Sequence, residues 1–382
     1  MVTQADTLVQ AQAALPAWLT SFEPHPWLPN GHLQTIVGNF LPRPPFELPD
    51  VEETVEVDPA DGSRVLCHCH WQPESVRAAS LTAVLVHGLN GSSNSRYICG
   101  IAQRAWDAGM NVVRMNMRNC GGTDALSPTL FHSGRSADVG AVVRHFTQRF
   151  GLKRVALVGY SMGGNMVLKL AGEWGARPPL VAVATVCSVI DLAACSNALH
   201  APSNFLYERH FLHALMQRFR HKAELFPAIY QTSGIGPVRS IREFDQKIVA
   251  PNCGFRDADD YYYRAASARV VDRIAVPALV LLAQDDPFIR LIPETRERIL
   301  ANPHIDFIEP SHGGHCAFLS RRPTDDVRTP DDVRTGDGVR TADGVRSGDG
   351  VQTAEGIHWA EAMVVRYLQA VNQGKHPHGR AT

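Results

Sequence analysis

Short apolar runs alternate with amphipathic segments along most of the chain. A continuous apolar run is typical of a buried parallel strand, whereas apolar residues at helical spacing indicate a helix that packs on one face. Strands and helices in alternation predict an α/β fold with a mostly parallel, doubly wound sheet. The expected strands are residues 81–86, 111–116, 155–160, 180–190, 276–283 and 305–309, and the expected helices are residues 97–108, 136–150, 165–174 and 357–371.

The amino-terminal part follows a different pattern. Residues 51–57 and 64–71 alternate apolar and polar positions and are joined by Asp61-Gly62, which predicts an antiparallel hairpin. Residues 24–36 are too punctuated by proline for a regular element, so we expect an ordered arm there. The hairpin contains Cys67-His68-Cys69-His70. Neighbouring strand residues point to opposite faces, so we predict no metal site there.

After the expected strand at 180–190, the alternation stops until residue 269. Residues 191–268 contain clustered aromatic and charged side chains, among them Phe211, Phe219 and Tyr261-Tyr262-Tyr263. We interpret this region as a mainly helical insertion that covers the active site as a cap. The aromatic side chains favour a small core of the cap over a lipid-binding groove.

Residues 325–354 form a six-residue tandem repeat with one valine per unit and charges of both signs. So few apolar side chains do not offset an ordering entropy of about 1–2 kcal/mol per residue, which predicts a disordered or loosely extended insertion. The expected divisions are an amino-terminal arm (1–50), the first part of an α/β core (51–190), the helical cap (191–268), the second part of the core (269–320), the repeat insertion (321–354), a carboxyl-terminal core helix (355–372) and a tail (373–382).

Composition narrows the class of protein. Apolar residues make up 45% of the chain and charged residues 20%, as in soluble globular proteins. The 37 lysine and arginine residues nearly cancel the 38 aspartate and glutamate residues, so no nucleic-acid partner is expected. Without a signal peptide or a membrane-spanning run, we expect a cytoplasmic protein, with peripheral membrane contact and oligomeric state left open. The eight scattered cysteines indicate reduced thiols.

The candidate nucleophile is Ser161, in the pentapeptide Gly159-Tyr160-Ser161-Met162-Gly163. An apolar strand precedes this Gly-x-Ser-x-Gly pattern and a helical pattern follows it, which is the context of a nucleophile elbow. The glycines leave room for the close approach of strand and helix. The alternative is a glycine-rich turn in which Ser161 caps the helix.

A carboxylate and a histidine follow later strands, in the order of an α/β-hydrolase triad. Asp286 is the candidate acid, because Ala283 sets the loop register, although Asp285 competes with it. His315 is the candidate base. Its competitors are His312 and, more distantly, His132 and His87. A serine hydroxyl needs such a base to remove its proton and an acid to hold the base in the correct tautomer.

The loop His87-Gly88-Leu89 follows the strand at 81–86 and can aim backbone N–H groups into the site. We therefore expect the backbone N–H groups of Leu89 and Met162 to form an oxyanion hole. The alternative is an ordinary turn at the end of a strand.

The separated sequence blocks together resemble the YheT-like α/β-hydrolases of bacteria, relatives of the mammalian ABHD lipases. The resemblance covers about residues 22–320 and the last helix, and the tandem repeat is absent from the family pattern. It implies an esterase or lipase that needs no cofactor or metal, acts on esters that include acylglycerols, and carries the triad Ser161, Asp286 and His315. The alternatives are a non-catalytic lipid-binding protein and an acyltransferase. The blocks lie at residues 32–36, 86–91, 116–122, 132–134, 159–165, 283–288 and 313–315.

Overall fold

The computed structural model describes residues 15–321 and 357–375. The tandem repeat at 325–354 therefore lies outside the described residues, as does most of the expected tail. Within the described part of the chain, no helix combines the length and apolarity needed to cross a membrane.

The core is one eight-stranded sheet in the order β1-β2-β4-β3-β5-β6-β7-β8. The first two strands form the predicted antiparallel hairpin, β2 pairs antiparallel with β4, and the remaining neighbours are parallel. The predicted α/β fold with a mostly parallel sheet is thus confirmed. The strands are β1 Val51–Asp58, β2 Ser63–His70, β3 Thr82–Val86, β4 Asn111–Met115, β5 Val155–Tyr160, β6 Leu180–Val186, β7 Ala278–Leu281 and β8 Ile305–Ile308.

Helices connect the parallel strands and pack in pairs beside the sheet. Helix α5 (Arg96–Asp107) packs against α14 (Trp359–Asn372), and α6 (Ser136–Phe150) packs against α7 (Met162–Trp174). The middle strands are buried on both faces, because helices cover them. The other helices of the sheet layer are α4 Glu74–Arg77 and α13 Pro293–Ala301.

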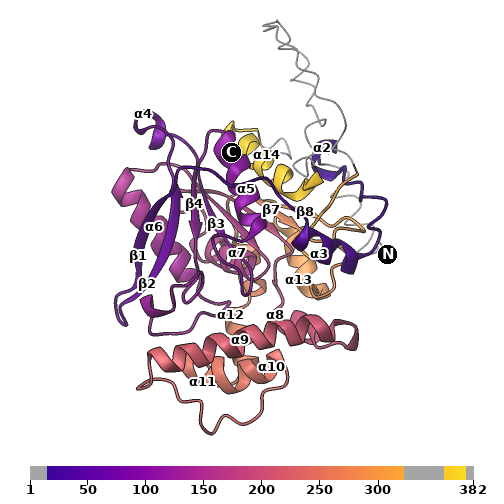
Figure 1. Cartoon of the computed structure of the whole chain (residues 1–382). Helices are drawn as coiled ribbons and strands as arrows, with labels where there is room; N and C mark the ends of the chain where they lie inside the picture. Colours follow the sequence, from indigo (N-terminus) through magenta and orange to yellow (C-terminus); the bar gives the residue numbers. More distant parts are fainter. Residues whose placement is uncertain (1–14, 322–356, 376–382) are drawn as a thin grey trace, which may run out of the picture.

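A mainly helical insertion follows β6, as the sequence predicts. Figure 1 shows α9, α10 and α11 as a separate layer below the sheet. The long helix α9 (Phe205–Leu225) runs across this layer. The remaining elements of the insertion are α8 Leu192–Leu199, α10 Ile241–Phe244, the π-helical turn Asp245–Val249, α11 Ala250–Asn252 and α12 Ala258–Ala265.

The expectation of an irregular arm at 24–36 is wrong for its second half. Helix α3 spans Gly31–Phe40, after the short helix α2 (Ala17–Thr20). The proline residues end before it, and the Asn30 side chain caps the helix by accepting hydrogen bonds from the backbone N–H groups of His32 and Leu33.

Segments from near both ends of the described chain pair with the segment that follows β8. Leu319 forms an isolated β-bridge with His358, and Pro24 forms another with Ser320. The backbone N–H of Trp359 donates to the carbonyl of Phe318 over 3.1 Å. The segment that follows β8 is therefore held from both sides.

Candidate active site

Ser161 lies at the sharp turn between β5 and α7. Its backbone has φ 52° and ψ −117°, a strained conformation for a residue with a Cβ. Gly163 permits this turn, because a Cβ there would lie 2.3 Å from the carbonyl oxygen of Val86. The Ser161 side chain makes no capping hydrogen bond to α7, so the structure gives no support to the helix-cap interpretation.

Ser161, His315 and Asp286 form a continuous hydrogen-bonded chain. The Ser161 Oγ lies 3.0 Å from His315 Nε2, and His315 Nδ1 lies 2.8 Å from Asp286 Oδ2. Asp286 is 1% exposed, and its other oxygen accepts hydrogen bonds from the backbone N–H groups of Phe288 and Ile289. The loops after β5, β7 and β8 thus bring together the three side chains predicted from separate parts of the sequence.

Burial and pairing have opposite effects on the pKa values of Asp286 and His315. Burial alone raises the pKa of the Asp286 carboxyl, but its contacts with His315 and two backbone N–H groups keep that pKa below its usual value. Burial alone lowers the pKa of His315, but the Asp286 carboxylate outweighs this effect and raises that pKa. The arrangement favours a proton on Nδ1 and leaves Nε2 to accept the serine proton.

The competing residues take other positions. Asp285 accepts a hydrogen bond from the Gly314 backbone N–H over 2.9 Å, and its second oxygen lies 3.4 Å from the His312 ring. Asp285 therefore contacts the backbone and the side chain of residues that precede His315, but not the His315 ring. His132 is buried against the aromatic rings of Phe255 and Tyr261.

His87 supports the loop that precedes Leu89. Its Nδ1 lies 2.8 Å from the Gly88 carbonyl oxygen, and its Nε2 accepts the Met117 backbone N–H over 3.1 Å. Burial, with a smaller effect of the Arg218 charge, lowers the pKa of His87 to about 4, so the ring is neutral. A Cβ on Gly88 would lie 3.1 Å from the Ser161 Cβ, which shows how closely this loop approaches the serine.

Helix α3 holds the histidine loop, a role that the sequence analysis missed. The Thr35 hydroxyl accepts the backbone N–H of His315 over 2.8 Å and donates to the Gly31 carbonyl over 2.6 Å. The Gln34 amide makes two hydrogen bonds to the backbone of Leu319. The available signal was the block at 32–36, which begins two residues after the capping residue Asn30.

Asn165, the last residue of the sequence block at 159–165, is a second positioning residue that was not predicted. Its side-chain amide donates to the carbonyls of Ser133 and Ala265, and its oxygen accepts the backbone N–H of Ser267. These bonds tie the first turn of α7 to the loop before α6 and to the end of the insertion.

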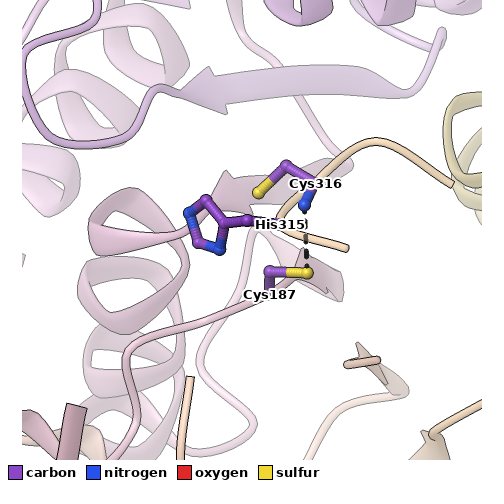
Figure 2. A group of neighbouring side chains, drawn as sticks. All are labelled: Cys187, His315 and Cys316. Carbon is purple, nitrogen blue, oxygen red and sulfur yellow. Dashed lines mark hydrogen bonds between the residues drawn. The ribbon is translucent and has the colours of Figure 1, made fainter. Parts of the chain in front are cut away.

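Two cysteines flank the histidine (Figure 2). The Cys187 sulfur accepts the Cys316 backbone N–H over 3.2 Å and lies 3.5 Å from the Gly314 carbonyl oxygen. One donor atom from each of Cys187, Cys316 and His315 lies within 4.8 Å of the others, a set with the chemistry of a metal site. Both ring nitrogens of His315 already have protein partners, so the contacts favour a role for Cys187 in holding the loop.

The Cys-His-Cys-His run on β2 provides no comparable group. His68 Nδ1 pairs with Asp50 over 2.7 Å, and His70 Nε2 accepts a hydrogen bond from Arg114. All eight cysteines of the chain are free thiols in the structure.

A mostly apolar cavity of about 150 Å³ opens at Ser161. The aromatic side chains of the insertion line it as well as packing with one another, so they do not serve only as a small core. Leu89 and Met162, the expected oxyanion residues, also lie in its wall. The apolar lining is Leu89, Leu130, Phe131, Met162, Val189, Leu192, Leu199, Phe211, Leu215, Phe219, Ile241, Phe244, Val249, Tyr261, Tyr262, Phe288 and Ile289.

Comparisons with known proteins agree with this architecture. A family model described as the alpha/beta hydrolase fold matches residues 84–233. The chain is 32% identical over 295 residues to YheT of Escherichia coli strain K12, a protein whose name describes an esterase, with 76% of this chain and 84% of that protein covered. It is 31% identical over 242 residues to the mouse phospholipase ABHD3, with 62% of this chain and 58% of that protein covered.

Solved structures show likeness at lower identity. The Pyrococcus furiosus esterase is 17% identical, with a TM-score of 0.45, and the match covers 72% of this chain and 88% of that one.

Proposed function

Because the chain belongs to the YheT-like α/β hydrolases, we propose that it is a serine esterase or lipase that cleaves carboxylic esters. The observation that carries the proposal is the hydrogen-bonded chain from Ser161 through His315 to Asp286. A strained serine in contact with an oriented imidazole is the arrangement that nucleophilic acyl transfer requires.

In the proposed reaction, the Ser161 Oγ attacks the ester carbonyl while His315 Nε2 takes the hydroxyl proton. The tetrahedral intermediate collapses, the ester C–O bond breaks, and His315 gives the proton to the departing alcohol. Water then attacks the acyl-enzyme and transfers a proton to Nε2. When the acid leaves, the proton returns to Ser161. Asp286 stabilises the imidazolium that forms in each step.

The backbone N–H groups of Leu89 and Met162 form the proposed oxyanion hole. Met162 directly follows the nucleophile at the start of α7, and Leu89 belongs to the loop that His87 fixes beside Ser161. Fixed donors at this place stabilise the charge that develops on the carbonyl oxygen, without reorganisation during the reaction.

The cavity favours esters with an apolar acyl or alcohol group. Its apolar walls bury hydrocarbon, and each buried methylene contributes about 0.8 kcal/mol to binding. The names of the relatives, an esterase and a phospholipase, are consistent with lipid esters.

The test is covalent labelling with a fluorophosphonate, followed by p-nitrophenyl esters of increasing chain length. We expect labelling and turnover that disappear in Ser161→Ala while the protein stays folded. A folded wild-type protein that neither reacts with the probe nor cleaves any ester would overturn the proposal in favour of a non-catalytic lipid-binding protein. Product analysis with a competing alcohol separates hydrolysis from acyl transfer.

A further inference from the structure

Helix α9 carries two cations into the wall of the cavity at Ser161. Arg218 and Lys222 lie one helical turn apart and both line this cavity. Arg218 is half-buried and Lys222 is fully buried. Both come from the insertion, whereas Ser161 comes from the sheet, so the two parts of the chain together enclose a charged cavity.

Lys222 has its hydrogen-bonding partners within the protein. Its ammonium donates to the backbone carbonyls of Asp124 and Ser127 and lies 4.2 Å from the centre of the Phe226 ring. These contacts fix the side chain in place. They supply partial negative charge but no carboxylate.

Arg218 is less completely satisfied. One guanidinium nitrogen donates to the Cys120 sulfur over 3.2 Å, and the guanidinium carbon lies 5.3 Å from the centre of the Phe131 ring. Among the described residues, no carboxylate lies within ion-pair distance of Arg218. A guanidinium has five N–H donors, and a thiol is a weak acceptor for one of them.

Lys222 has acidic neighbours, because burial lowers its pKa to about 8 while the charges of Asp124 and Asp61 act to raise that pKa. Asp245 is the one carboxylate among the described residues of the cavity wall. It accepts the Tyr262 hydroxyl over 2.7 Å, and burial raises its pKa to about 7, so it carries only part of a negative charge near neutral pH. Asp286, behind His315, is paired with that imidazole. Arg218 is therefore a half-buried cation of the cavity wall that forms no ion pair with a carboxylate of the described residues.

We propose that Arg218 forms an anion subsite of the active site, which selects esters whose acyl or alcohol part carries a carboxylate or phosphate. An anionic group on the substrate supplies the partner that the guanidinium lacks, while the apolar walls hold the hydrocarbon of the same molecule. As a substrate preference, this subsite rests on the proposed esterase function.

The test compares matched charged and neutral substrates. One arm uses mono-p-nitrophenyl esters of dicarboxylic acids, from adipate to suberate, beside the same compounds with the free acid as a methyl ester. The second arm uses dihexanoylglycerol and dihexanoylglycerol 3-phosphate. We expect kcat/KM to exceed that of the neutral partner by about tenfold or more, either for the phosphate or for a dicarboxylate of one chain length. The difference should come mainly from a lower KM for the anionic ester. The two arms separate a carboxylate on the acyl chain from a phosphate on the alcohol.

Arg218→Gln is expected to bring the ratio of kcat/KM for the anionic ester over its neutral partner close to one, because the charged contact is lost, and this ratio within one protein is independent of any general loss of turnover. Arg218→Lys keeps a positive charge and should keep part of the preference for the anionic ester. This variant keeps the proposal testable if Arg218→Gln fails to fold. The matched control is Arg220→Gln, an exposed residue on the same helix that does not line the cavity. This variant should behave as the wild type.

The subsite would be overturned if the wild type cleaved charged and neutral esters equally well, or if Arg218→Gln kept the wild-type preference. In either case, cleavage of the neutral esters by the wild type would leave the esterase proposal intact. Binding gives a readout without turnover. Calorimetry of monomethyl suberate and of glycerol 3-phosphate with Ser161→Ala should show binding of one of them that Arg218→Gln in the same background weakens about tenfold or more. If neither anion binds, the subsite is refuted whether or not the protein is an esterase.

Discussion

Replacing Thr35 by valine tests whether α3 positions the proposed base. Valine keeps the shape of threonine but removes the hydroxyl that accepts the His315 backbone N–H over 2.8 Å. A buried N–H without a partner costs about 1–3 kcal/mol. The histidine loop can avoid that cost by moving toward water, but the 3.0 Å contact between His315 and Ser161 then has to be restored for each turnover.

The free energy of the lost hydrogen bond therefore adds to the activation barrier of the reaction. We expect kcat of Thr35→Val to fall about fivefold to a hundredfold, since about 1.4 kcal/mol corresponds to a factor of ten. KM should change little, because Thr35 does not line the cavity. The assay is steady-state hydrolysis of a p-nitrophenyl ester, with thermal unfolding measured in parallel.

Thr35→Ser is the matched control, because it keeps the hydroxyl and removes only a methyl group. It should retain most of the wild-type kcat. If the valine variant is folded and turns over at the wild-type rate, α3 does not position the histidine. A rise in KM at constant kcat would contradict the reasoning equally, because it would indicate a role in substrate binding.

Three further changes test other parts of the site. Catalysis needs neutral His315, and Asp286 raises the pKa of this imidazole, so a pH–rate profile should show activity falling with decreasing pH at a midpoint above the ordinary histidine value of about 6.5. In Asp286→Asn, this midpoint should move to lower pH and kcat should drop by about four powers of ten. Gly163→Ala places a Cβ 2.3 Å from a β3 carbonyl oxygen and should lower the unfolding free energy by about 1–3 kcal/mol, measured by denaturant titration; an unchanged midpoint would show that the turn can relax. Cys187→Ala removes the sulfur that accepts the Cys316 N–H and should reduce kcat severalfold more than Cys187→Ser, and equal rates for both variants would rule out a positioning role.

The sheet and the meeting of Ser161, Asp286 and His315 could be predicted because parallel strands place their carboxyl ends at one edge. Each of these residues follows an apolar run that sequence periodicity detects. The choice of Asp286 over Asp285 depended on loop register, and the structure gives the two carboxylates different partners.

The rest of the site depends on contacts between distant segments. Helix α3 was misread because the prolines before Asn30 dominated the local pattern, and its contact with the histidine loop has no local signature. The contacts of Arg218 with Cys120 and of Lys222 with Ser127 likewise join the insertion to core loops. Local periodicity identifies a helix at such positions, but it does not determine what the helix faces.

The histidine loop is held by two segments that lie far apart in the sequence. Leu319 is bonded to Gln34 of α3 on one side and bridged to His358, at the start of α14, on the other. During synthesis, the nucleophile turn and the oxyanion loop emerge long before α14 is available to dock. In a chain that extends past β8 but not yet to α14, the histidine loop keeps its contacts with α3 but lacks the bridge to His358. The contact with α14 therefore makes the position of the proposed base depend on a segment that is remote in the sequence, even though the base lies next to the serine in space.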